Sequence, residues 1–353
     1  MAGRLGRTIA SGGRWLRRIR SHPVSFLGVV SVLCVLFGLV QFGLALALLA
    51  PADFAVIGVL MAAGGFIANM VDMRTIDLTT RLFFAVPETD KSGRADILAA
   101  GAFVQLALGL VVSLLTVPAI MVLGPRLLET GVDTWWILST ASAGGTNFLV
   151  SALTTYIRVI GDFRAFGWLR LGTQLATTAI MIVSLLLMPS VDGYFLAIGL
   201  SAVVTLGVTA PVYCLIARRT LGGSVLRRMP WAGLENHARS KRFLVSGSLI
   251  GFAKMLSRTG DVLVFAALSS DAVTGTYRVA RQASDALFSL SDSIHQFYGP
   301  TIVAALSRED VRAFRVLCTR LIFLGLAAGA GAALAAFLFL DPLVATLLPQ
   351  HHG

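Results

Sequence analysis

One apolar segment long enough to cross a membrane, residues 272–303, carries five ionisable side chains. They are Arg278, Arg281, Asp285, Asp292 and His295. On an α-helix, where each residue turns by about 100°, all five fall within an arc of about 100°. Ionisable groups are costly in hydrocarbon, so they usually face a protein interior or a water-filled cavity. The stripe therefore predicts a path for a polar or charged substrate through a membrane.

The apolar segment before it, residues 243–268, carries three further charges: Lys254, Arg258 and Asp261. A turn near Ser270 makes the two segments antiparallel neighbours, and we call them together the charged hairpin. Matching depths then pair opposite charges: Asp261 with Arg281, Arg258 with Asp285, and Lys254 with Asp292. Such pairs either make charged helices tolerable in lipid or line a cavity and rearrange during transport. Both interpretations stay open at this point.

The hairpin has more cations than anions, and Arg278 has no partner at its depth. A spare guanidinium suits bidentate capture of phosphate or carboxylate, although it could also reach the outer interface. The predicted substrate-binding residues are Arg258, Arg278, Arg281 and Lys254. The predicted coupling or cavity ion-pair residues are Asp261, Asp285, Asp292, His295 and Asp72. His295 is either a proton-linked switch or a hydrogen-bonded histidine, and Asp72 either faces the cavity or ends a helix in water.

The elements that position these residues are apolar helices. Of the 353 residues, 56% are hydrophobic and 13% charged, whereas soluble domains carry about 25% charged residues. Continuous apolar runs of 20 or more residues predict an all-α polytopic membrane protein with about nine transmembrane helices. The predicted spans are 24–50, 53–72, 96–123, 134–157, 166–189, 193–217, 243–268, 272–303 and 313–340. A Gly124-Pro125 turn closes the third span, and Gly144-Gly145 in the fourth is a hinge or a close packing point.

The basic residues predict the topology. The N-terminal tail and the alternate loops carry 23 Lys and Arg, and the opposite loops carry one, Arg126. This asymmetry places the N-terminus in the cytoplasm, and nine spans then leave the C-terminus of the chain outside. The predicted organisation is a basic cytoplasmic tail (1–23), a first six-helix bundle (24–217), a basic cytoplasmic linker (218–242) and a partial second bundle of three helices (243–353).

Several function classes lack their signals. The net charge of +11 is accounted for by topology, and no basic-aromatic interleaving accompanies it, so we predict no nucleic-acid partner. There is no HExxH, P-loop, dinucleotide fingerprint or Ser/His/Asp spacing, so we predict no enzyme activity and no cofactor. Cys34, Cys214 and Cys318 stand singly in apolar segments without metal-ligand spacing, so we predict no metal site.

Two motifs resemble the oligosaccharide flippases of the multidrug/oligosaccharidyl-lipid/polysaccharide exporter superfamily. The stretch Leu48-Leu49-Ala50-Pro51-Ala52-Asp53-Phe54-Ala55 resembles the first outer turn of that family, with alanine at its two glycine positions. The second motif, Arg258-Thr259-Gly260-Asp261 followed by Gly275-Thr276-Tyr277, resembles its seventh and eighth helices, and Gly299-Pro300 closes the latter. Family members have about twelve or more spans, so this chain looks short for the family, and residues 341–353 resemble the turn before a tenth helix.

The resemblance implies two helical bundles around a central cavity that work by alternating access. It implies translocation of polyprenyl-diphosphate-linked oligosaccharide across the bacterial cytoplasmic (inner) membrane, for cell-surface polysaccharides such as lipopolysaccharide. Membrane lipids and the polysaccharide polymerase or export machinery are the further expected partners. Two alternatives are a cation-coupled drug or metabolite exporter of the same superfamily, and a non-transporting or truncated subunit of a polysaccharide-synthesis complex. The excess of cations in the charged hairpin favours the flippase.

Overall fold

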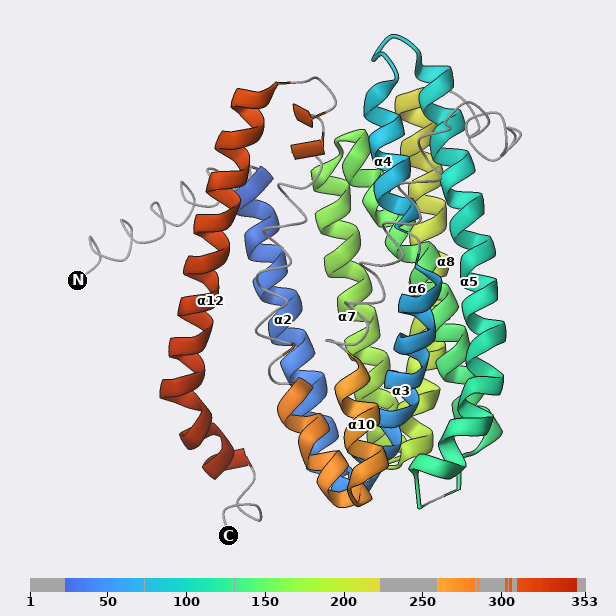
Figure 1. Cartoon of the computed structure of the whole chain (residues 1–353), viewed down its shortest axis with the longest axis vertical. Coiled ribbons are helices and arrows are strands. Elements are labelled where there is room, and N and C mark those ends of the chain that lie inside the picture. The colour runs from blue at the N-terminus through green and yellow to red at the C-terminus, as the bar shows by residue number, and fades with distance from the viewer. Residues whose placement is uncertain are drawn as a thin grey trace, which may run out of the picture.

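The computed structural model describes residues 23–72, 74–129, 131–222, 259–282, 285, 302–303, 305–306 and 310–347. Throughout these ranges the ordered elements are helices, which confirms the predicted all-α class (Figure 1). The first bundle contains α2 (Pro23–Leu48), α3 (Pro51–Val71), α4 (Thr75–Ala85), α5 (Lys91–Leu127), α6 (Thr134–Ile160), α7 (Phe163–Leu187) and α8 (Val191–Leu221). The later chain contributes α10 (Asp261–Leu268), a helix over residues 271–282, and α12 (Val311–Leu347).

Several helices begin where a short polar side chain caps them. Asp90 accepts a hydrogen bond from the Gly93 amide at the start of α5, and Asp162 accepts one from the Ala165 amide at the start of α7. Asp53 Oδ2 accepts the Ala50 amide in the Leu49 to Asp53 turn, which starts α3. These bonds satisfy backbone N–H groups that a helix start leaves free. The chain can therefore turn tightly between long antiparallel helices.

Three predicted boundaries were wrong. The predicted loop 73–95 contains α4 and the start of α5, because residues 75–85 form an amphipathic helix whose apolar side packs on α5 and α6. The predicted turn at Gly124-Pro125 is absent, since α5 continues to Leu127 with Pro118 and Pro125 inside it. Each of these prolines lacks an N–H and so removes one i→i−4 hydrogen bond from the helix. Helix α12 also runs past its predicted end at residue 340, because the residues after Pro342 are again apolar.

Six described helices are long and apolar enough to cross a membrane: α2, α3, α5, α7, α8 and α12. The chain is therefore a multi-pass membrane protein. Helix α6 is the exception among the long helices of the first bundle, and it packs against α3, α4, α5, α7 and α8. Of its small and polar residues, Ser139, Thr140 and Gly145 are buried, whereas Ser142, Asn147 and Ser151 are exposed.

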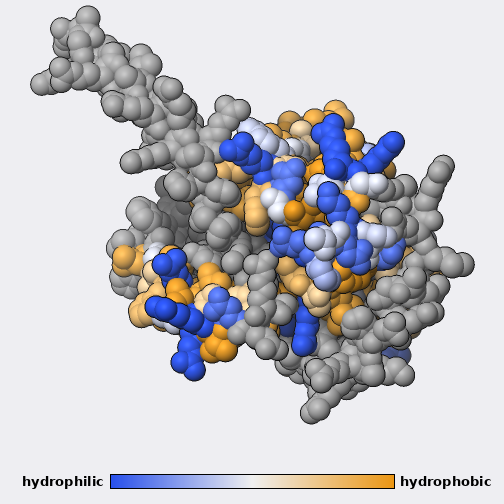
Figure 2. All heavy atoms as spheres, turned by 90° about the horizontal axis from the view of Figure 1, so that it is seen from above, coloured by the Kyte–Doolittle hydropathy of each residue, from blue (hydrophilic) through white to orange (hydrophobic). Residues whose placement is uncertain are grey.

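The first bundle holds two apolar cores, one at each end. One core joins α4 with the adjoining ends of α5, α6, α7 and α8, and includes the buried rings of Phe83, Tyr156 and Phe166. The other joins the start of α3 with the far ends of α5 to α8, and includes Phe54 and Phe195. Figure 2 looks onto the α4 end and shows hydrophilic residues gathered there among apolar ones. This is the end predicted to face the cytoplasm.

The later chain contacts the first bundle near the other end, where α3 begins. A β-carbon on Gly58 of α3 would lie 2.9 Å from Cγ of Arg278, so the missing side chain lets the two helices approach. The Glu129 amide after α5 also donates a hydrogen bond to the buried Asp271, at 3.2 Å. Ala266 of α10 joins the apolar core at this end. The described part of the second bundle is thus attached to the first through α10 and the turn after it, residues 269–270, which we call the α10 turn.

Candidate functional site

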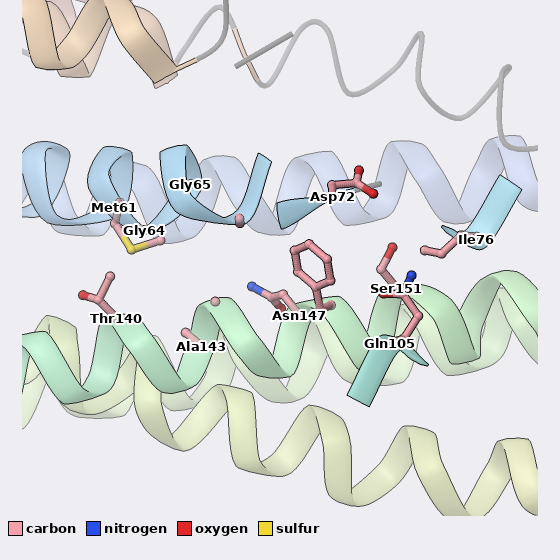
Figure 3. A pocket seen from close by; sticks show the side chains of 13 residues that line it. Met61, Gly64, Gly65, Asp72, Ile76, Gln105, Thr140, Ala143, Asn147 and Ser151 are labelled. Atoms are coloured by element: carbon pink, nitrogen blue, oxygen red, sulfur yellow. The ribbon is translucent and has the colours of Figure 1, made fainter. Parts of the chain in front are cut away.

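A pocket of about 360 Å³ lies inside the first bundle, between α3, α5 and α6 (Figure 3). It stands between the two apolar cores and reaches toward the α4 end. Its lining residues are Met61, Gly64, Gly65, Ala68, Asp72, Ile76, Gln105, Thr140, Ala143, Gly144, Asn147, Phe148 and Ser151. A volume of this size is typical of small-molecule sites in proteins.

Small residues on two facing helices create the space. Gly64, Gly65 and Ala68 of α3 and Ala143 and Gly144 of α6 line the pocket. Figure 3 shows Gly64 and Gly65 on one side of it and Ala143 on the other. Larger side chains at these positions would fill the gap between the helices. Helix α6 is held in place by its close contact with α5, where a β-carbon on Gly145 would clash with the Gly109 carbonyl oxygen. The sequence left Gly144-Gly145 as either a hinge or a close packing point. At Gly145 the structure shows close packing.

The lining combines one charge with several hydrogen-bonding groups on an apolar wall. Among the described residues that line the pocket, Asp72 is the only ionisable one. Gln105, Thr140, Asn147 and Ser151 supply amide and hydroxyl groups. Met61, Ile76 and Phe148 supply apolar and aromatic surface. A carboxylate on such a wall suits an amphiphilic organic cation, whose charge pairs with the acid while its body contacts the apolar surface.

Asp72 occupies a defined position at the end of α3. It is the C-terminal cap residue of the helix, and its Oδ1 accepts the Arg74 amide at 2.9 Å. Arg74 itself pairs with Asp77 at 3.5 Å. Across the pocket wall, the Gln105 amide donates to the Thr75 hydroxyl at the start of α4. Asp72 thus ends α3 and also lines this pocket, and its predicted place in a cavity with the charged hairpin stays a prediction.

Gln105 is fully buried, and its Oε1 has no hydrogen-bond partner among the described residues. An unsatisfied amide oxygen in a membrane bundle is costly unless a donor reaches it. Sequence reasoning missed Gln105, together with Asn147 and Ser151 of α6. The available signal was the polar composition of residues 134–160, which makes α6 the least apolar of the long helices in the first bundle.

The charged hairpin is present in part. Arg281 Nη1 lies 3.0 Å from Asp261 Oδ2, which is the pair that matching depths predict. Tyr277 donates a hydrogen bond to the same carboxylate oxygen at 2.7 Å and stacks on Phe265, with ring centroids 4.0 Å apart. Asp285 lies 3.4 Å from Arg281 Nε, so Arg281 stands between two carboxylates. This arrangement joins α10 to the helix that follows it.

The remaining predicted site residues divide into two groups. Arg278 is half-buried against Gly58, and its Nε is buried without an acceptor among the described residues. Lys254, Arg258, Asp292 and His295 lie outside the residues that the structure describes. Their predicted pairings, including that of Arg258 with Asp285, stay predictions. Among the described members of the predicted set, only Asp72 lines the pocket of the first bundle.

Replacing Arg281 with methionine is expected to destabilise the protein. The change leaves Asp261 and Asp285 without their shared counter-charge in a mostly apolar setting. Breaking a fully buried pair costs roughly 3–5 kcal/mol, and Asp285 is half exposed, so we expect about 1–3 kcal/mol. Thermal unfolding of the purified protein in detergent measures the loss. The double variant with Asp261→Asn should regain part of it, and an unchanged melting temperature in Arg281→Met would contradict a stabilising role.

Comparison with known proteins identifies the fold. No family model matches the chain. No curated protein matches it either. Solved structures do match over nearly its whole length, at low sequence identity.

A MOP superfamily transporter from Pyrococcus furiosus has a TM-score of 0.65 and 16% sequence identity, over 92% of this chain and 74% of the transporter chain. The reverse polarity of the binding pocket of that transporter is described as suggesting a different function. An outward-facing multidrug resistance MATE family transporter of the MOP superfamily has a TM-score of 0.66 and 16% identity, over 94% and 76% of the two chains. A mutant of the Vibrio cholerae MATE transporter VcmN has a TM-score of 0.58 and 19% identity, over 93% and 74%. The described fold is thus similar to that of MOP superfamily transporters.

Proposed function

We propose that the chain is a membrane transporter that exports small amphiphilic organic cations by alternating access. The observation that carries the proposal is the pocket between α3, α5 and α6, whose described lining has one carboxylate, Asp72, on an otherwise apolar and hydrogen-bonding wall. The similarity of the fold to multidrug transporters of the MATE family supports it. Those proteins are transporters, which also favours transport over enzyme activity for this chain.

This proposal replaces the order of preference that the sequence alone suggested. The cation excess of the charged hairpin favoured a lipid-linked oligosaccharide flippase, with drug export as an alternative. The solved structures similar to the chain favour the exporter, and the pocket agrees in charge, since its only described ionisable residue is an acid. Within the hairpin, Arg281 is engaged by Asp261 and Asp285, so its charge is balanced there.

The topology is part of the proposal. We place the protein in the bacterial inner membrane with the N-terminus in the cytoplasm, following the distribution of Lys and Arg. The α4 end then faces the cytoplasm, and the α10 turn faces outward. The pocket reaches toward the cytoplasmic end, from which a substrate for export would enter. An ion gradient across the membrane would supply the driving force.

Everted membrane vesicles that contain the chain test the proposal. Ethidium, a fluorescent organic cation, should accumulate in them when a proton or sodium gradient is imposed, and vesicles without the chain serve as control. An anionic dye of similar size should not accumulate, because the Asp72 carboxylate repels it. Equal accumulation in the presence and absence of the chain would count against cation export.

Transport of lipid-linked oligosaccharide is the second candidate, and one observation favours it. The Nε of Arg278 is buried without an acceptor in the described part of the chain, so an anionic group could satisfy it. The diphosphate of a polyprenyl-linked sugar is such a group. Measuring the arrival of lipid-linked sugar in the outer leaflet of cells, with Arg278→Ala as the variant, separates this candidate from the first.

A further inference from the structure

The joint between α3 and α4 contains an unusual backbone conformation. Helix α3 ends at Asp72 and α4 begins at Thr75, with Arg74 as its N-terminal cap residue. Arg74 has φ 53° and ψ 36°, which is the left-handed region. It is the only residue other than glycine with positive φ in the described part of the chain. A side chain with a β-carbon disfavours this region, so the surrounding structure must hold Arg74 there.

The main local support for Arg74 is Asp72. The Asp72 carboxylate accepts the Arg74 amide at 2.9 Å, and an ionised acceptor makes this bond about twice as strong as a neutral one. The Arg74 carbonyl also accepts the Leu78 amide at 3.1 Å, as the first backbone bond of α4. The contact between the Arg74 guanidinium and Asp77 is 3.5 Å long, with both side chains more than one third exposed. Exposed pairs of this kind contribute little. Of the described side-chain contacts of Arg74, the hydrogen bond to the Asp72 carboxylate is therefore the stronger one.

The same carboxylate belongs to the pocket. Asp72 and Ile76, on the two sides of the joint, both line it, and the Gln105 amide ties the Thr75 hydroxyl to α5 in the same wall. The joint thus forms one end of the pocket, where Asp72 and Ile76 lie (Figure 3). Any movement of α4 against α3 changes the shape of that end.

We infer that Asp72 couples the charge of the pocket's occupant to the α3–α4 joint. When a cation pairs with the carboxylate, the negative charge that strengthens the Arg74 hydrogen bond is neutralised. The left-handed residue then loses its main support, and the released joint, in which α4 separates from α5, becomes about tenfold more populated. The coupling rests on the proposed function, because it takes an organic cation as the occupant. Under this coupling, the position of α4 at the cytoplasmic end of the pocket differs between the empty and the occupied protein.

The joint is tested first without any ligand. Thr80 of α4 is 6% exposed, and among the described residues its hydroxyl bonds to the Ile76 carbonyl of its own helix. Thr80→Cys in a background without the native cysteines therefore reports separation of α4 through its rate of maleimide labelling. Asp72→Asn keeps the acceptor but not the charge, and should raise the rate about threefold. Asp72→Ala removes both and should raise it about tenfold. Adding Arg74→Gly to Asp72→Ala should restore the slow rate, because glycine adopts positive φ freely.

Two results in this series would overturn the inference. One is labelling of Asp72→Ala at the rate of the unmodified protein. The other is a double variant that labels as fast as Asp72→Ala alone, which would show that the backbone at position 74 does not control the joint. Asp72→Asn is the conservative variant and is expected to keep the melting temperature of the protein with Asp72. If Asp72→Ala fails to fold, the labelling rate of Asp72→Asn still tests the inference.

Ethidium then tests the coupling. Saturating ethidium should raise labelling of Thr80→Cys several-fold in the protein with Asp72 and Arg74 present. In Arg74→Gly, ethidium binding by fluorescence should persist, while labelling stays slow with and without the dye. Binding without any change in labelling would overturn the coupling and leave the proposed function standing. Absence of ethidium binding would overturn both.

Discussion

Asp72→Asn is expected to lower ethidium efflux at least about 30-fold. Removing one partner of a partly desolvated charge pair costs roughly 2–5 kcal/mol, and the lower limit of this range corresponds to about 30-fold. Asp72 is the only ionisable residue in the described lining of the pocket, so no other side chain of that lining replaces its charge. Initial rates of dye accumulation in everted vesicles, at equal protein content, measure the effect.

The stability of this variant should change little. The asparagine oxygen can still accept the Arg74 amide, which the Asp72 carboxylate accepts at 2.9 Å. Glu88→Gln is the matched control, because Glu88 is an exposed acid in the turn between α4 and α5, outside the pocket lining. Efflux by Asp72→Asn within about threefold of the unmodified protein would refute the assignment of Asp72 as the cation-binding group.

Gly145→Ala is expected to destabilise the protein by forcing two helices apart. A β-carbon at this position would clash with the Gly109 carbonyl oxygen and with Ser113 Oγ, both on α5. The serine can rotate, although it would lose its hydrogen bond to the Ala141 carbonyl, but the backbone oxygen cannot move without the helix. Helices α5 and α6 must therefore separate, at a cost of about 1–3 kcal/mol or more. The α6 wall of the pocket would shift with them.

Gly144→Ala is the control for this prediction. It adds the same methyl group one residue earlier, where the nearest atom, Cγ1 of Val112, lies at an ordinary contact distance of 3.4 Å. Thermal unfolding in detergent should show a melting temperature several degrees lower for Gly145→Ala and nearly unchanged for Gly144→Ala. Similar losses in the two variants would argue against a backbone contact between α5 and α6.

The apolar spans could be predicted from the sequence because the membrane imposes a length and a composition on each of them. The pair between Asp261 and Arg281 was also accessible, since antiparallel helices joined by a short turn bring equal depths together. Helix α4 was not, because eleven residues of mixed polarity at a membrane surface carry neither the length nor the hydropathy of a span. The apolar side of α4 is accounted for only in the folded bundle, where it packs against α5 and α6.

The pocket could not be predicted for a related reason. Gln105 is a single polar residue within an apolar run of α5, and its position opposite Asp72 depends on how α3 and α5 cross. The glycines that set such crossings are common in membrane helices, and their partners lie far away in sequence. Sequence alone therefore gave most weight to the charged hairpin, where charges stand close together along the chain.

The polar composition of α6 has a consequence for how the protein is made. Lateral release from the translocon into lipid depends on the apolarity of the segment, and Ser, Thr, Gly and Asn in the middle of α6 lower it. Helix α5 precedes α6 after a short turn and is strongly apolar. Contact through Gly109 and Gly145 would bury one side of α6 against α5 before lipid reaches it. Helices α5 and α6 should therefore enter the membrane as one hairpin, so that truncation after residue 160 inserts α6 only when α5 is present.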